Sequence, residues 1–148
     1  MKIRNSAKAM IIQDDYVLLT KNEDHDGYFY LFPGGGQEHG ETLQQTLIRE
    51  CREEVGKKVD VQDLRHLREY IGKHHEHASF DADVHQIEFY FACSIIGDEE
   101  KPSNPDSHQI GIEWIHKDQL PTIRLYPKAL AAHVLQAAET VIYLGDVN

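Results

Sequence analysis

Hydrophobic residues occur in short runs at the start of the chain. Two apolar runs, residues 7–12 and 16–20, are separated by three polar residues, which predicts a β-hairpin, although its turn contains no glycine. An aromatic run over residues 28–32 stops at a proline and three glycines. This pattern predicts a short strand that leads into a loop.

From Thr42 the spacing of the apolar residues becomes helical. The apolar positions that recur every fourth residue are Leu43, Leu47, Cys51 and Val55. Thr42 suits an N-cap, and Gln45 stands three residues later, as a capping box requires. Gly56 provides a C-terminal stop. We therefore predict a well-capped amphipathic helix between Thr42 and Gly56.

Strand patterns return after this helix. Residues 59–71 predict a strand with one interruption, and residues 112–115 predict a short strand. In residues 85–96 apolar and polar positions alternate, which predicts a strand with two distinct faces.

The remaining segments predict loops and a second helix. Residues 72–83 are polar and rich in histidine, and residues 97–107 contain two prolines, so both predict loops. Pro127 suits a first helical position and predicts a helix that runs to about residue 140. Strands mixed with two amphipathic helices predict an α/β fold in which helices cover a sheet. No boundary divides the chain, so we expect one domain over residues 1–148.

Three acids stand close together on the first predicted helix. At about 100° per residue, Glu50, Glu53 and Glu54 fall within an arc of roughly 100°, beside the apolar stripe and near the glycine loop. Carboxylates placed in this way repel one another but suit Mg²⁺, which prefers oxygen ligands and substrate phosphates. The alternative is a solvated charged face, in which Arg49 and Glu53 form a supporting ion pair.

The charge balance limits the partners. The formal net charge is −10, from 25 acidic and 15 basic side chains. This disfavours a polynucleotide partner, which requires clustered Lys and Arg, whereas a small phosphate-bearing ligand remains compatible if a metal bridges it. We expect no membrane segment and no targeting signal. The two cysteines, Cys51 and Cys93, predict buried reduced thiols in a cytoplasmic protein.

The acidic helix and its glycine loop together resemble the Nudix box of the MutT/Nudix hydrolases, G-x5-E-x7-R-E-U-x-E-E-x-G-U, where U is a bulky aliphatic residue. Every fixed polar or glycine position matches, namely Gly35, Glu41, Arg49, Glu50, Glu53, Glu54 and Gly56. Two aliphatic positions differ, with Cys51 at the first and Lys57 at the last. Cys51 packs as a small hydrophobe, and Val59 is expected to supply the apolar packing that Lys57 does not provide.

This resemblance implies an α/β/α sandwich around a mixed sheet. It also implies hydrolysis of a nucleoside diphosphate linked to a further group X, with Mg²⁺ or Mn²⁺ as cofactor and a small nucleotide as partner. Whether the chain forms a homodimer is left open.

The resemblance also assigns roles to single residues. It implies that Glu50 and Glu54 are the main metal ligands, and that Glu53 is a further ligand or the general base. The loop carbonyl of Gly35 is expected to reach a metal. Arg49 is expected to hold the glutamates in place, and Glu41 to brace the loop.

The general base has candidates outside the helix. In similar proteins an acid often lies in the loop before a segment like Glu113-Trp114. Here Asp106 is the only carboxylate of residues 104–109. The position nearest that of the usual acid is His108 or Gln109. Glu88, on the polar face of its strand, is another candidate.

Substrate contacts are less closely determined. Of the aromatic residues before the glycine loop, Tyr28 and Phe29 are candidates to stack on a base, whereas packing in a strand core is the alternative. The histidine-rich residues 72–85 predict a solvated loop, with a substrate lid and an adventitious zinc site as alternatives.

ADP-ribose or a similar nucleotide sugar is the first expectation for the substrate. A house-cleaning nucleoside triphosphate pyrophosphatase is the second. The alternative from another class is a Nudix domain that senses a nucleotide without turnover.

Overall fold

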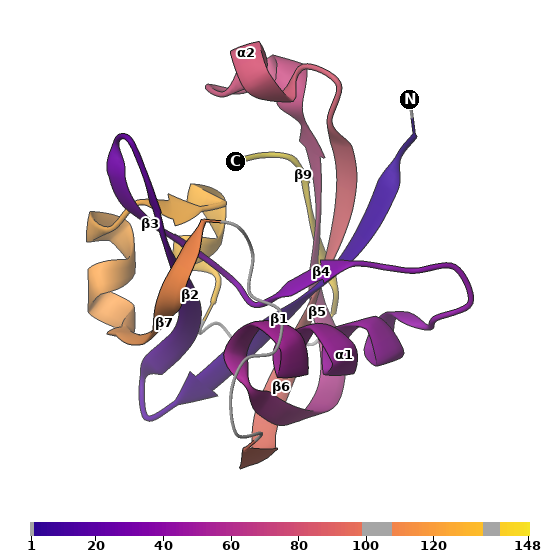
Figure 1. The fold of residues 1–148 in the computed structure, drawn as a ribbon, viewed down its shortest axis with the longest axis vertical. Helices are drawn as coiled ribbons and strands as arrows, with labels where there is room; N and C mark the ends of the chain where they lie inside the picture. Colours follow the sequence, from indigo (N-terminus) through magenta and orange to yellow (C-terminus); the bar gives the residue numbers. More distant parts are fainter. Residues whose placement is uncertain (1, 99–107, 135–139) are drawn as a thin grey trace.

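The computed structural model describes residues 2–98, 108–134 and 140–148. Within them, the strands form one curved mixed sheet (Figure 1). The strands are β1 (Arg4–Gln13), β2 (Tyr16–Asp24), β3 (Gly27–Leu31), β4 (Gly34–Gly36), β5 (Lys57–Ile71), β6 (His85–Asp98), β7 (Gln109–His116), β8 (Leu125–Tyr126) and β9 (Ile142–Asp146). Their order is β8-β3-β2-β1-β6-β5-β9, while β4 pairs with β1 and β7 pairs with β2. The pairings β1–β6, β5–β9 and β3–β8 are parallel.

Helices cover the sheet on both faces. They are α1 (Leu43–Val55), α2 (Ala78–Asp81) and the 3₁₀ helices η1 (Gly72–His74), η2 (Lys117–Thr122) and η3 (Lys128–Ala132). One core cluster joins α1 to β1, β2 and β6 through residues such as Leu47, Ile11 and Phe91. A second cluster places Leu120 and Leu130, of η2 and η3, against the other face. The expected α/β/α arrangement is therefore present, with 3₁₀ helices forming the second layer.

The predicted first hairpin is confirmed, and its turn explains the missing glycine. Ile12 pairs with Val17 and Gln13 with Tyr16, which leaves Asp14 and Asp15 as the two turn residues. Both have positive φ, 49° and 67°. Aspartate tolerates this left-handed region better than most residues, so a tight hairpin turn forms here without glycine.

The glycine loop that we expected after β3 is instead a short strand, so this prediction was wrong. β4 pairs antiparallel with β1, with Lys8 opposite Gly34 and Ser6 opposite Gly36. Gly34 has a φ of 139°, and a Cβ atom there would overlap the carbonyl oxygen of Ala7. Only glycine allows the two backbones to approach so closely. The three glycines therefore dock the start of the acidic segment onto the central strand.

The prediction for α1 is confirmed at both ends. The Thr42 hydroxyl accepts a hydrogen bond from the Gln45 amide at 3.1 Å, and the Gln45 side chain accepts one from the Thr42 amide at 2.9 Å. Gly56 has a φ of 65° and ends the helix in the left-handed conformation. Cys51 is buried under this helix, as expected, and so is Val59 just beyond it. Both cysteines are buried and free.

The histidine-rich segment is not the loop that we predicted. It folds into η1 and α2, which connect the end of β5 to the start of β6 (Figure 1). We call η1, α2 and the adjoining ends of β5 and β6 the β5–β6 arm. Gly72 makes this compact link possible, because a Cβ atom there would overlap the backbone of Asp81, while its amide donates to the Val84 carbonyl at 2.9 Å.

The α-helix predicted from Pro127 is also wrong for the residues that the structure describes. Pro127 is an N-cap, and η3 ends at Ala132, while residues 135–139 lie outside the described part. Leu130 and Val134 bury their side chains in the core through this 3₁₀ turn, so tertiary packing overrides the helical pattern. The strand β9, which pairs with the distant β5, was not predicted. In the described ranges, no helix has the length and apolar character needed to cross a membrane.

Candidate active site

Arg49 is the centre of the candidate site. Its Nε donates to Glu41 at 2.8 Å and its Nη2 to the other Glu41 oxygen at 3.0 Å, a bidentate ion pair. Nη1 donates to Glu50 at 3.0 Å and to Glu53 at 3.3 Å. Nη2 also donates to the Gly36 carbonyl at 3.1 Å. One guanidinium therefore fixes two acids of α1 relative to the preceding loop and to β4.

Glu41 lies between this loop and α1. One of its oxygens accepts hydrogen bonds from the Glu38 amide and from the Thr46 hydroxyl, both at 3.0 Å. The hydrogen bonds from Arg49 are the main cause that lowers the Glu41 pKa to about 2, so this carboxylate is ionised at neutral pH. This geometry is that of a brace between the loop and the helix.

Glu54 is buried at the other side of the acidic cluster. Its Oε2 accepts a hydrogen bond from the Gly34 amide at 3.1 Å, which places the carboxylate directly against β4. The Gln109 side chain donates to the Glu54 main-chain carbonyl at 2.8 Å. The end of α1 is thus tied to both β4 and β7.

Gly35 is in close contact with Glu50. A Cβ atom on Gly35 would lie 2.6 Å from the Glu50 carboxyl carbon, so the acid occupies the space that a side chain would need. Glu50, Glu53, Glu54 and the Gly35 carbonyl supply oxygen atoms only, which is the ligand type that hard divalent cations prefer. The residues present therefore fit Mg²⁺ or Mn²⁺.

Among the described residues, the ligand atoms of the three α1 glutamates do not all lie within 4.8 Å of one another, and a group of side chains that meets this distance lies elsewhere. Asp24, His25 and Asp26, at the exposed β2–β3 turn, place their ligand atoms within 4.8 Å of one another. On α1, the Arg49 guanidinium lies between Glu50 and Glu53 instead. An exposed acidic turn of this kind is common without a bound ion, and Asp24 is already paired with Arg124.

A cleft of about 470 Å³ is lined by residues of the β5–β6 arm and of the strands β3 and β8. Its aromatic lining consists of Phe29, Tyr70, Phe80 and Tyr126. Of the two predicted stacking residues, only Phe29 lines this cleft. Tyr28 is half exposed, and the Lys21 ammonium lies 4.2 Å from the centre of its ring. The third aromatic residue of this run, Tyr30, is buried in the core. Burial, followed by a hydrogen bond to Glu113, raises its pKa to about 12.

Arg124 organises the wall of the cleft formed by β3 and β8. It pairs with both oxygens of Asp24, at 2.8 and 2.6 Å, and its Nε donates to the Tyr126 hydroxyl at 3.0 Å. Its guanidinium carbon lies 5.0 Å from the centre of the Phe29 ring. Phe29 and Tyr126 meet edge to face, with ring centres 6.1 Å apart. These contacts connect Arg124, Asp24, Phe29 and Tyr126 within one wall of the cleft.

The opposite wall of the cleft comes from the β5–β6 arm, which contains the histidine-rich segment. His77 Nε2 lies 3.2 Å from the Tyr126 hydroxyl, so the two walls touch. Phe80 is 81% exposed and lines the cleft from α2. His74 and His75 contact the two oxygens of Asp146 at 2.8 and 2.6 Å. These histidines are therefore partnered within the fold, and the arm forms a wall of the cleft.

The candidate general bases lie in different surroundings. Glu88 is buried on the cleft floor, where its Oε1 accepts hydrogen bonds from Arg68 Nε and the Tyr90 hydroxyl, both at 2.6 Å. Burial opposes its charge, but Arg68 and Lys8 outweigh this effect and leave the Glu88 pKa below its ordinary value. A carboxylate held in this way is a poor proton acceptor. Asp106 lies outside the described residues.

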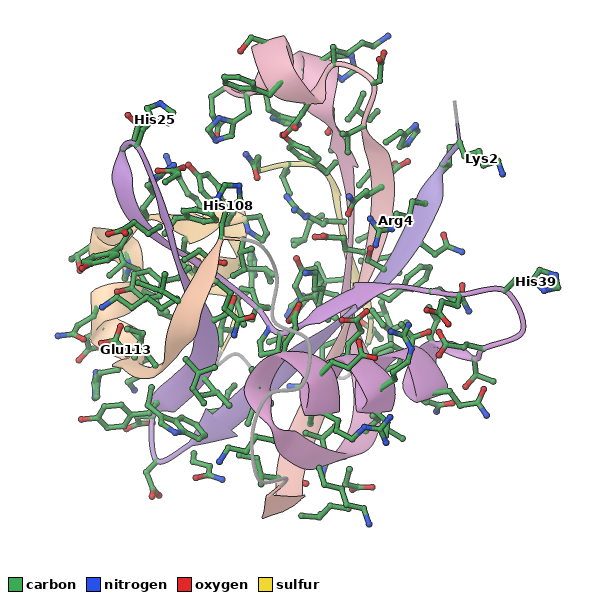
Figure 2. The ribbon with its side chains drawn as sticks, in the orientation of Figure 1. Lys2, Arg4, His25, His39, His108 and Glu113 are labelled. Carbon is green, nitrogen blue, oxygen red and sulfur yellow. The ribbon has the colours of Figure 1, made fainter. Side chains whose placement is uncertain are left out.

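Some residues of the cleft were not found from the sequence. His108, labelled in Figure 2, lies just before β7 and lines the cleft, and it was considered only as a possible position for the base. Arg124 and Tyr126 carry no motif and reach the cleft because β8 pairs with the distant β3, whereas Phe80 reaches it from α2. Lys8 had one available signal, because it is a charged residue inside an apolar run of β1.

An acidic helix docked on a glycine strand, with both elements packed on a curved mixed sheet, defines the class of Nudix domains. The chain belongs to this family, since the model of the NUDIX domain matches residues 2–136.

Curated relatives share part of their length with this chain. It is 29% identical over 115 residues to the NAD-capped RNA hydrolase NudC of Photorhabdus laumondii. This match covers 76% of the chain and 39% of NudC. It is 37% identical over 67 residues to the nucleoside triphosphatase NudI of Salmonella agona, covering 43% of the chain and 48% of that protein. The chain thus spans less than half of either relative.

Solved structures support the fold. An ADP-ribose pyrophosphatase from Streptococcus suis has a TM-score of 0.65 at 20% identity, over 95% of this chain and 98% of its own. A NUDIX hydrolase from Nitrosomonas europaea has a TM-score of 0.72 at 20% identity, over 93% and 98%. At such identities the likeness establishes the fold alone.

Proposed function

We propose that this chain hydrolyses a phosphoanhydride bond in a nucleoside diphosphate linked to a further group X, with Mg²⁺ or Mn²⁺ as cofactor. The observation that carries the proposal is the set of α1 carboxylates packed against β4, next to an aromatic cleft. The two regions are continuous, because Lys8 lines the cleft and pairs in register with Gly34.

The acidic cluster would hold the cation through Glu50, Glu54 and the Gly35 carbonyl, with Glu53 beside them. A bound divalent cation neutralises the diphosphate and lowers the pKa of an attacking water. Arg49 fixes the orientation of Glu50 and Glu53, so less reorganisation is needed during the reaction. Glu53 is the more exposed of these two acids, at 24% against 16%, and we assign it the removal of the water proton.

The cleft supplies a place for the nucleoside. Phe29 and Tyr126 offer aromatic surface on one wall, and Phe80 offers it on the other. A planar base gains both apolar burial and ring contacts in such a site. Phe80 is 81% exposed, so a base bound in the cleft would bury apolar surface of this ring.

The charges of the cleft favour a sugar as X. Its lining contains three cations and three carboxylates, namely Lys8, Arg68, Arg124, Asp24, Asp81 and Glu88. Arg68 and Arg124 are already paired with acids. A third phosphate would meet little uncompensated positive charge, whereas the hydroxyls of a sugar would find polar partners. ADP-ribose or a similar nucleotide sugar is therefore our first choice, and the balanced charges also argue against a polynucleotide.

A panel of substrates tests this proposal. ADP-ribose, UDP-glucose, diadenosine tetraphosphate, the four dNTPs and an NAD-capped RNA oligonucleotide are incubated with Mg²⁺, Mn²⁺ or excess EDTA, and the products are identified. We expect AMP and ribose 5-phosphate from ADP-ribose, with no turnover in EDTA. Pyrophosphate from a dNTP would support the house-cleaning alternative instead. Binding without any turnover would indicate a sensor, and full turnover in EDTA would contradict the metal-dependent reaction.

A further inference from the structure

Lys8 projects from the central strand into the cleft. Its neighbours Ala7 and Ala9, on the other face of β1, are buried under α1. Lys8 itself lies opposite Tyr90 of β6 and lines the cleft. A charged side chain on this strand therefore faces the region where a substrate would lie. Arg4 lies four residues before Lys8 on the same face of β1 and is labelled in Figure 2.

Lys8 differs from the other cations of the cleft. Arg68 is paired with Glu88 at 2.6 Å, and Arg124 with Asp24 at the same distance. Among the described residues, no carboxylate oxygen lies within 4.0 Å of the Lys8 ammonium, which makes one long contact, 3.5 Å, to the Phe32 carbonyl. An ammonium has three donors, so Lys8 retains capacity for an anionic ligand.

The position of this ammonium connects the two halves of the site. Phe32 stands two residues before Gly34, whose amide holds Glu54. On the neighbouring strand β6, Glu88 pairs with Ser6, two positions before Lys8 on β1, and both Lys8 and Glu88 line the cleft. A diphosphate that joins a metal at α1 to a nucleoside in the cleft has to pass this point.

We propose that Lys8 binds the diphosphate of the substrate on the cleft side of β4. This assignment rests on the proposed function and adds a substrate-binding residue outside the acidic helix. Lys8 offsets phosphate charge at the place where the chain, with a net charge of −10, would otherwise repel it. The competing explanation is a structural one, in which Lys8 serves only to offset the charge of Glu88.

The test compares Lys8→Met, Lys8→Gln and Lys8→Arg, with Lys117→Met as a matched control. Lys117 is partly exposed near the β1–β2 turn, where its ammonium forms a long ion pair with Asp15, 3.8 Å. On the best substrate of the panel, Lys8→Met and Lys8→Gln should raise KM about tenfold or more, as expected for loss of a charge-assisted hydrogen bond. Lys8→Arg should restore most of the affinity, and Lys117→Met should match the wild type.

A second measurement separates phosphate binding from a structural role. In calorimetric titrations with Mg²⁺, ADP should bind Lys8→Met about tenfold more weakly than the wild type, whereas adenosine should bind both equally. Equal losses for ADP and adenosine, unchanged KM and ADP affinity, or failure of both neutral variants to fold would overturn the proposal. Because ADP binding needs no turnover, a wild-type protein that hydrolyses nothing in the panel would refute the proposed function and still leave the role of Lys8 decided by the titration.

Discussion

The backbone of Gly35 and the carboxylate of Glu50 are in contact, with the position of a Gly35 Cβ atom only 2.6 Å from the acid. The place of a candidate metal ligand on α1 is therefore set by the absence of a side chain on β4. Gly35 does not need a positive φ, so its role is to leave space rather than to permit an unusual backbone conformation.

Gly35→Ala should displace the Glu50 carboxylate while leaving the fold intact. The clash involves the end of a flexible side chain, so we expect the free energy of unfolding to fall by less than about 1 kcal/mol. A misplaced ligand should lower kcat/KM about 10²-fold. Gly111→Ala is the control, because a Cβ atom there meets nothing within 4 Å. Wild-type activity in Gly35→Ala would show that Glu50 is not required at its present position.

Arg49→Lys should lose the network although it keeps the charge. Lysine cannot form the bidentate pair with Glu41 while also contacting Glu50, Glu53 and the Gly36 carbonyl. We expect kcat/KM to fall at least about tenfold, and the free energy of unfolding to fall by about 1–3 kcal/mol, measured by urea denaturation. Arg52→Lys, at an exposed position of the same helix, should change neither quantity. Similar results for both variants would contradict a special role for Arg49.

Glu54→Gln should reduce kcat about 10²-fold or more without unfolding the protein. The amide oxygen of glutamine can still accept the hydrogen bond from Gly34. Removing one of the neighbouring negative charges also reduces repulsion on α1, so the thermal midpoint without metal should not fall. A marked decrease in that midpoint would assign Glu54 to folding rather than to the site.

Glu53→Gln distinguishes a general base from a ligand. If Glu53 accepts the water proton, kcat should fall about 10²-fold while the metal concentration needed for half-maximal activity stays unchanged. A higher metal requirement, with partial rescue by extra metal, would indicate a ligand. A kcat within about threefold of the wild type at saturating metal would transfer the base to another residue, with Asp106→Asn and Glu88→Gln as the variants to compare.

His66 should make the fold sensitive to mild acid. It is buried at 1% exposure, and within the described residues neither ring nitrogen has a hydrogen-bond partner. Burial, followed by the nearby His133, lowers the His66 pKa below its ordinary value of 6.5. As the pH is lowered, the unfolded chain therefore binds this proton at a higher pH than the folded chain does. The free energy of unfolding keeps its full value above pH 6.5 and decreases as the pH falls from 6.5 through the lowered pKa.

His66→Leu should remove this part of the pH dependence. Urea denaturation of the variant at pH 5.5 and 7.5 should show a smaller difference than the wild type shows. His39→Leu, at the exposed tip of the loop before α1 (Figure 2), should retain the wild-type difference. An unchanged pH dependence in His66→Leu would assign the effect to other groups.

Local signals predicted the elements that depend on local chemistry. The capping residues Thr42 and Gln45 and the stop at Gly56 placed α1 correctly, because caps act within one helical turn. The spacing of Glu50, Glu53 and Glu54 also placed the candidate ligands at the edge of the buried face, since a helix has a fixed period.

Long-range contacts account for what the sequence did not predict. The glycines of β4 are a typical turn signal, and only their pairing with β1 makes them a strand. Nothing near Arg124 indicates Asp24 as its partner, because the ion pair depends on β8 lying beside β3. The predicted helix after Pro127 failed for the same reason, since the core selected a 3₁₀ turn there.

The parallel pairing of β1 with β6 has a consequence for how the protein reaches its native state. Arg4 of β1 pairs with Gln86 of β6, so β1, to which β4 is docked, finds this neighbour only after β6 has been synthesised. Contacts of such long sequence separation close slowly, whereas α1 can nucleate early from its own caps. During synthesis, its glutamates are therefore present on a nascent helix before β4 has a stable strand to dock against. Assembly of the candidate site should coincide with the slow, cooperative step of folding rather than precede it.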